Sequence, residues 1–116
     1  MVDRLDHAIQ IFIALCPHVL AVHDLLTKIR LDLSEGHLMD FYYNATLGKY
    51  GYTLIRGGQR ILGWDNAPHH PGLESFPHHC HLPDGTVEPS ALTGDPETDV
   101  VIVAIEVNTF LRAQEN

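Results

Sequence analysis

The sequence lacks any long hydrophobic run. Its two longest uninterrupted apolar stretches span residues 11–16 and 100–105, six residues each, whereas a helix needs about 20 apolar residues to cross a bilayer. Near the N-terminus, Asp3, Arg4 and Asp6 stand among apolar neighbours, unlike the basic start and unbroken apolar stretch of a secretory signal. We therefore expect no contact with a membrane and a cytoplasmic location.

Cysteine and basic residues are also scarce. Cys16 and Cys80 are the two thiols, too few for a disulfide framework in a chain of this size, and we expect Cys16 in the core. Lys and Arg number 7 against 15 Asp and Glu, which gives a formal net charge of −8. This charge argues against a broad surface for duplex nucleic acid, because basic side chains hold the phosphates there. A focused nucleic-acid site remains compatible with it.

What remains is the composition of one folded domain. The chain has 116 residues, of which 45% are hydrophobic and 19% charged, and domains usually hold about 100–150 residues. We expect a single domain over residues 1–116, with a helix and a sheet in residues 1–64, a structured loop in residues 65–94 and a helix in residues 95–113. The expected fold class is α+β, with helices on one face of an antiparallel sheet.

Hydrophobic periodicity places the expected helices at the two ends of this domain. Apolar residues recur at three- and four-residue spacing from Leu5 to Cys16, with Asp3 as a cap, before Pro17 ends the helix. Asp95 as a cap and Pro96 in the first turn mark the start of the second helix. Its core-facing stripe comprises Val100, Val103, Ala104, Val107, Phe110 and Leu111.

Period-two alternation predicts four strands between the helices, over residues 25–33, 39–45, 50–56 and 60–64. Four strands in succession suggest an antiparallel meander. Residues 34–37 form the first expected turn, and Gly57 with Gly58 supplies the positive φ angles of a tight hairpin turn. Within the loop region, we expect short extended pieces at residues 76–82 and 86–88, joined by a turn at residues 83–85.

Some apolar residues lie off the core-facing rows of the two helices, namely Ile11, Val101, Ile102 and Ile105. A lone domain rarely leaves a large apolar patch in water. We therefore expect a partner protein or a second copy of the chain, as in a homodimer with two-fold symmetry. If the C-terminal segment were a buried strand, or a helix under the loop, the same residues would be hidden within one chain.

Histidine is the compositional outlier, because five of the nine histidines fall within residues 69–81. The segment has two parts, Trp64-Asp65-Asn66-Ala67-Pro68-His69-His70-Pro71 and Phe76-Pro77-His78-His79-Cys80-His81. Proline fixes its own φ and pushes the residue before it toward extended backbone, so these rings are held on a stiff chain. If residues 76–82 are extended, His78 faces the core, and His79 and His81 face outward.

Such a cluster is suited to general acid and base catalysis at neutral pH. RNA supplies its own nucleophile, the 2′-hydroxyl, so we expect an endoribonuclease that uses no metal and no other cofactor. The candidate catalytic residues are Asp65, His69, His70, His79 and His81. The candidate phosphate-binding residues are Arg56 and Arg60, and structural roles are expected for Asn66 and His78.

The same residues allow other interpretations. His79 and His81, with His69 or His70 and with Asp65 or Cys80, could hold zinc in a metal-dependent nucleotide hydrolase, although their spacing matches no standard zinc motif. The rings could instead bond backbone carbonyls and fasten the loop. The charge of −8 also fits a non-catalytic acidic module that binds a basic partner.

The two-part signature at residues 64–71 and 76–81 resembles that of the TumE-like toxin family of prokaryotic type II toxin–antitoxin systems. The surrounding pattern of helix, four strands, signature and terminal helix is similar over nearly the whole chain. The resemblance implies a small growth-inhibiting toxin of suspected ribonuclease activity on RNA. It also implies neutralisation by a separately encoded antitoxin of the helix-turn-helix type.

Overall fold

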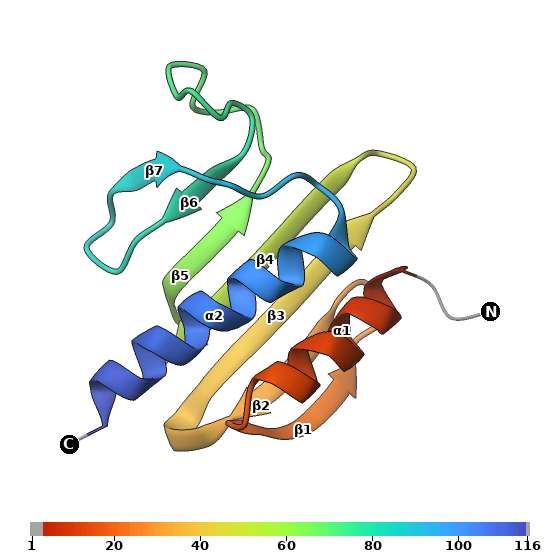
Figure 1. Cartoon of the computed structure of the whole chain (residues 1–116), viewed down its shortest axis with the longest axis vertical. Coiled ribbons are helices and arrows are strands. Elements are labelled where there is room, and N and C mark those ends of the chain that lie inside the picture. Colours follow the sequence, from red (N-terminus) through yellow and green to blue (C-terminus); the bar gives the residue numbers. More distant parts are fainter. Residues whose placement is uncertain (1–3, 116) are drawn as a thin grey trace.

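The computed structural model describes residues 4–115 and shows an α+β fold in which two helices cover one face of an antiparallel sheet (Figure 1). The helices are α1 (Arg4–Leu15) and α2 (Pro96–Gln114). The strands are β1 (Val19–Asp24), β2 (Ile29–Leu33), β3 (His37–Asn44), β4 (Lys49–Arg56), β5 (Gln59–Asp65), β6 (His79–His81) and β7 (Val87–Pro89). Each strand pairs antiparallel with the next, in the order β1-β2-β3-β4-β5-β6-β7. The expected fold class is confirmed, but the sheet has seven strands instead of four.

Strand β1 and the later start of β2 correct the expected meander at its first edge. Residues 25–28 form a turn, in which the Leu25 N–H donates to the Lys28 carbonyl at 2.9 Å. Leu26 has a φ of 71°, and the Asp24 carboxylate accepts its N–H at 2.9 Å. The alternation beyond the turn is as predicted, because the residues at both ends and the middle of Ile29–Leu33 are buried.

The other edge of the sheet also extends further than the sequence predicts. Parts of the expected extended pieces form β6, which pairs with β5, and β7, which pairs with β6, whereas residues 76 and 77 of the expected 76–82 piece lie in a turn. The turn between them closes where the Gly85 N–H donates to the Leu82 carbonyl at 2.9 Å. The hairpin turn between β4 and β5 is as predicted, with φ angles of 59° at Gly57 and 75° at Gly58.

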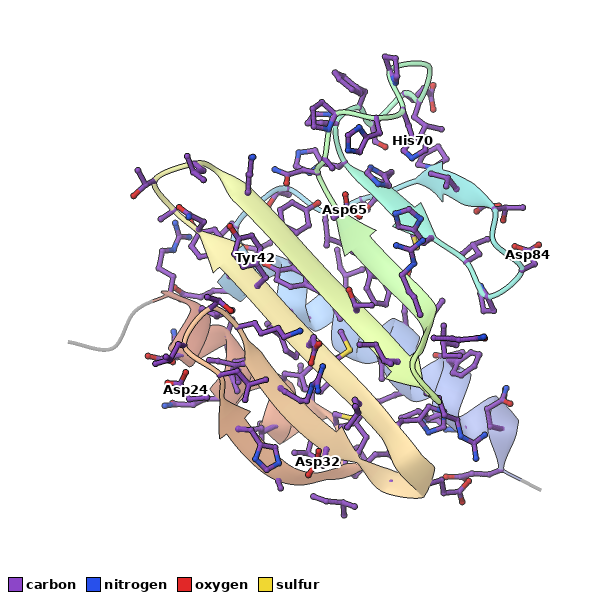
Figure 2. The ribbon with its side chains drawn as sticks, turned by 180° about the vertical axis from the view of Figure 1, so that it is seen from behind. Asp24, Asp32, Tyr42, Asp65, His70 and Asp84 are labelled. Carbon is purple, nitrogen blue, oxygen red and sulfur yellow. The ribbon has the colours of Figure 1, made fainter. Side chains whose placement is uncertain are left out.

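The core lies between the sheet and the two helices, which run side by side (Figure 1). The Phe12 ring of α1 meets the Phe41 ring of β3 edge-on, with centroids 5.1 Å apart. On α2, the Glu106 carboxylate accepts a hydrogen bond from Trp64 Nε1 of β5 at 3.1 Å. Cys16 is buried, as expected. The opposite face of the sheet carries no helix (Figure 2), which leaves it open for a site.

The two predicted helices are confirmed. All residues of the expected α2 stripe are buried except Phe110, which is partly buried against the core. Asp95 stands before Pro96 and accepts a hydrogen bond from the Thr98 hydroxyl at 2.5 Å, whereas Asp3, the expected cap of α1, lies outside the described residues. Val101 and Ile105 are 39% and 59% exposed, so the loop does not cover them.

Within residues 4–115, neither helix combines the length and the apolar character that crossing a lipid bilayer requires.

Candidate functional site

The candidate site lies on the open face of the sheet, where β5 and β6 pair. Asp65 pairs with His79 across these strands, and Gly63 pairs with His81, so alternate side chains of both strands reach the same face. One carboxylate oxygen of Asp65 lies 3.0 Å from His79 Nε2. The other lies 3.1 Å from His81 Nε2. A single carboxylate therefore contacts two imidazole rings.

Each member of this group is also fixed by the backbone. The Asp65 carboxylate accepts the N–H of Ala67 at 2.9 Å. His79 Nδ1 lies 3.0 Å from the Pro77 carbonyl oxygen, and because that oxygen only accepts hydrogen bonds, Nδ1 must carry a proton and donate it. The Nε2 atom of His79 is therefore the one that faces Asp65.

His70 brings a third imidazole to the group from the loop between β5 and β6. Its ring centroid lies 4.7 Å from that of His79 and 6.2 Å from that of His81, and the His79 and His81 rings lie 4.8 Å apart. Figure 2 shows His70 on the loop beyond the end of β5, where Asp65 lies. We call Asp65, His70, His79 and His81 the histidine cluster.

The cluster corrects one expectation about exposure. His79 and His81 lie on the face away from the helices, as predicted, but His79 is only 2% exposed because it packs among the neighbouring rings. His81 is partly buried. Burial lowers the pKa of His81, the nearby Arg60 charge lowers it further, and Asp65 opposes both effects. A lowered pKa favours the neutral form of the His81 ring, which is the form that accepts a proton.

Arg60 reaches the cluster because of a β-bulge. The register between β4 and β5 shifts where Leu54 pairs with Leu62 but Ile55 pairs with Arg60. This extra residue turns Arg60 to the face that carries Gly63 and Asp65, whereas uninterrupted alternation would place it with Leu62 on the core side. A Cβ on Gly63 would lie 2.9 Å from Arg60 Cδ and 3.6 Å from His81 Cδ2, which shows how close Arg60 and His81 come.

A hollow of about 420 Å³ adjoins the cluster and shares Asp65 with it. Its wall includes Lys49 and Tyr42, two residues outside the predicted catalytic and phosphate-binding set. His69 is exposed and lines this hollow instead of joining the other rings. Lys49 is the first residue of β4 and belongs to no motif, so only the folded structure shows that it shares this hollow with Asp65. The hollow offers a cation and a ring next to the cluster.

Three predicted residues stand apart from the cluster. Arg56 is exposed at the far end of β4, where it pairs with Gln59 across the hairpin turn. Asn66 bridges two segments, because its side chain accepts the Tyr50 N–H at 3.1 Å and donates to the Gly48 carbonyl at 2.7 Å. His78 turns toward the core side, and its Nδ1 lies 2.8 Å from the Tyr50 hydroxyl.

Cys80 is separated from the cluster by the sheet itself. It pairs with Glu88 of β7 and is buried, and its neighbours on the helix side are Trp64 and Glu106. Burial raises the pKa of the Cys80 thiol to about 11, with smaller contributions from the charges of Glu106 and Glu88. A buried thiol that keeps its proton is a poor nucleophile at neutral pH.

The sequence also identifies the family of the chain. Residues 10–111 match the profile of the family described as Toxin TumE. The chain belongs to the TumE toxin family. This range includes the whole histidine cluster, Arg60, half of α1 and most of α2, so the TumE match covers the site and most of the fold together. No curated protein and no solved structure gave a significant match.

Proposed function

We propose that this TumE family toxin acts as an endoribonuclease, and that the histidine cluster carries its general acid and base chemistry without a metal. Family membership gives the toxin role. The observation that supports the chemistry is one carboxylate, Asp65, within 3.0 and 3.1 Å of two imidazole nitrogens, with a third ring beside them. A carboxylate in this position orients imidazole rings and stabilises the charge they gain on taking up a proton.

The proposed reaction is cleavage of RNA by its own 2′-hydroxyl. His81 takes the proton of the 2′-hydroxyl while the 2′-oxygen forms a bond to the adjacent phosphorus. The bond from phosphorus to the 5′-oxygen breaks, and protonated His70 gives its proton to that oxygen. The products are a 2′,3′-cyclic phosphate and a free 5′-hydroxyl. His79, buried and bonded to the Pro77 carbonyl, lies 3.0 Å from Asp65 and acts as a positioning residue.

The surrounding cations fit a phosphate substrate. Arg60 lies next to His81, where its guanidinium can bind the phosphate that is attacked. Lys49 and His69 line the adjacent hollow, where the neighbouring nucleotide would lie. These side chains form a local basic site on a chain whose net charge is −8. RNA would therefore be bound through a few contacts at this site and not through a broad basic surface. Arg56 is too far along β4 to take part.

The test is the double variant His70→Gln and His81→Gln, assayed for cleavage of labelled RNA in the presence of chelator. We expect cleavage to fall by about 10²–10⁴-fold, the usual contribution of general acid and base groups, and growth inhibition to be lost. His23→Gln is the matched control, because His23 also contacts a carboxylate, that of Asp32 at 2.8 Å, far from the cluster on β1. Undiminished cleavage by the double variant would refute the assignment.

A toxin of this family is expected to have an antitoxin, and the negative net charge of the toxin indicates that the antitoxin is basic. The surplus of acidic side chains would steer a basic partner toward this chain, and we propose the helix-turn-helix type that the resemblance implies. If the protein inhibits growth but the purified protein cleaves no RNA, the alternative of a non-catalytic binding module gains support.

A homodimer stays a prediction, because Val101 and Ile105 of α2 are exposed. Light scattering at micromolar concentration tests this prediction.

A further inference from the structure

We propose that Asp65, His79 and His81 also form a binding site for one Zn²⁺ ion, and that the bound ion switches off the proposed ribonuclease chemistry. One ligand atom of each residue lies within 4.8 Å of the other two. The carboxylate oxygens lie 3.0 and 3.1 Å from the two Nε2 atoms. Tetrahedral bonds of about 2.0–2.2 Å to a zinc ion hold neighbouring ligand atoms about 3.3–3.6 Å apart, so the three ligand atoms, which lie within 4.8 Å of one another, need to shift by only about 1 Å to surround one ion.

An independent observation concerns the other ring nitrogen of His79. Its Nδ1 donates to the Pro77 carbonyl at 3.0 Å, which leaves Nε2 as the atom directed at Asp65. Metal-binding histidines usually hold their second nitrogen in this way, because the hydrogen bond fixes the tautomer and the ring orientation. Asp65 is held too, by the Ala67 N–H at 2.9 Å. Two of the three ligands therefore have outer hydrogen bonds like those of a metal site.

The ligand set selects the kind of ion. Two imidazoles and one carboxylate suit Zn²⁺ and similar transition metals, whereas Mg²⁺ and Ca²⁺ prefer shells made of oxygen. Cys80 contributes nothing, because it faces the helix side of the sheet. Three protein ligands leave a fourth position, as in open zinc sites. The neighbouring ring of His70, with its centroid 4.7 Å from that of His79, is placed to supply or border that position.

Arg60 opposes the ion. Its positive charge acts on His81, and the same charge repels a cation bound there. Arg60→Ala should therefore tighten Zn²⁺ binding while it weakens cleavage of RNA. This opposite effect on two measurements separates an ion at the cluster from an ion held elsewhere on an acidic chain.

Occupancy of the site has a consequence that rests on the proposed function. The Asp65 carboxylate accepts the N–H of His81 Nε2, so the neutral His81 ring takes up a proton at Nδ1. Coordination of a metal through Nε2 moves the ring proton to Nδ1, and His81 can then no longer accept the proton of the 2′-hydroxyl. The same ring thus serves either proton transfer or metal binding. We expect chelator-treated protein to be active and the Zn²⁺-loaded protein to be inactive, with activity restored by chelator.

The experiment measures binding without RNA, by calorimetric titration of the chelator-treated full chain with Zn²⁺ and by the absorption spectrum of its Co²⁺ form. One ion should bind per chain. Asp65→Asn and His81→Gln should each weaken binding at least tenfold, whereas His23→Gln should bind as the unchanged protein does. Circular dichroism checks that each variant is folded. Failure of the unchanged protein to bind Zn²⁺, or equal affinity in all variants, would overturn the site.

These measurements distinguish a failure of the Zn²⁺ site from a failure of the proposed ribonuclease activity. Zn²⁺ binding that depends on Asp65 and His81, together with no cleavage of RNA, would leave the metal site standing and refute the ribonuclease. Cleavage that survives chelator but is unaffected by Zn²⁺ would leave the ribonuclease standing and refute the switch.

Discussion

Gly63 leaves the space that Arg60 occupies beside the histidine cluster, and Gly63→Ala tests that arrangement. The added Cβ would lie 2.9 Å from Arg60 Cδ, whereas ordinary contacts begin at 3.4 Å. Arg60 Cδ must therefore retreat by about 0.5 Å or more, and because the Arg60 side chain is long and exposed, it can swing away without moving the sheet. The contact with His81 Cδ2, at 3.6 Å, needs no such shift.

The expected effect on stability is small and the expected effect on activity is large. Replacing Gly by Ala in compatible backbone stabilises a protein by about 0.4–1 kcal/mol, which offsets the displacement of Arg60, so the free energy of unfolding should change by less than about 0.5 kcal/mol. A charge-assisted hydrogen bond to phosphate contributes about 1.5–3 kcal/mol. Its loss should lower kcat/KM for RNA cleavage by about 10- to 100-fold.

The control is Arg60→Ala, alone and combined with Gly63→Ala. If the alanine at position 63 acts by moving Arg60, the double variant should cleave RNA no more slowly than Arg60→Ala does, because the two changes remove the same contact. Urea unfolding gives the stability of each protein. The reasoning would be refuted if the fold losses in RNA cleavage of the two single variants multiplied in the double variant. It would also be refuted if Gly63→Ala lowered the free energy of unfolding by more than about 1 kcal/mol.

Two further predictions concern the sheet and the core. Burial raises the pKa of Asp40, but hydrogen bonds and charges from Arg30 and Lys28 lower it more, to below its usual value. Because Arg30 and Lys28 are about one third exposed, Asp40→Asn should cost about 1–2 kcal/mol in urea unfolding above pH 4, and the difference should vanish as the pH falls through the lowered pKa; an equal difference at pH 2 would contradict this. Phe12→Ala should cost about 3–5 kcal/mol, because the fully buried Phe12 ring packs on Phe41. A loss below about 1 kcal/mol in thermal unfolding would show that the contact between α1 and β3 contributes little.

The sequence predicts the helices and the central strands because their apolar residues recur with the right period. It misses β1, because this edge strand turns Leu20 and Val22 toward solvent, where they are 71% and 49% exposed. It also places the start of β2 too early, since Leu26 adopts a positive φ that leucine rarely takes. Both errors arise where neighbouring segments, and not the local pattern, decide the structure.

At the candidate site, the sequence indicates the residue types but not their arrangement. Strand alternation correctly puts His79 and His81 on one face. The position of Asp65 beside them depends on the pairing of β5 with β6. The burial of His79 depends on how the loop places the His70 ring against it, and no local sequence pattern predicts this contact. The bulge at Ile55 and Arg60 gives Arg60 the face opposite to the one that uninterrupted alternation would give it, and Lys49 joins the hollow only through the pairing of β3, β4 and β5.

The order of the strands lets this protein assemble in the order in which it is synthesised. Each strand pairs with the one made just before it, so hairpins can form from local contacts while the rest of the chain is still absent. The helix-facing side of the sheet, however, stays partly uncovered until α2, the last 19-residue element, packs beside α1. The histidine cluster is complete by residue 81, on the opposite side. On a nascent chain, the candidate site is therefore complete before the core is closed.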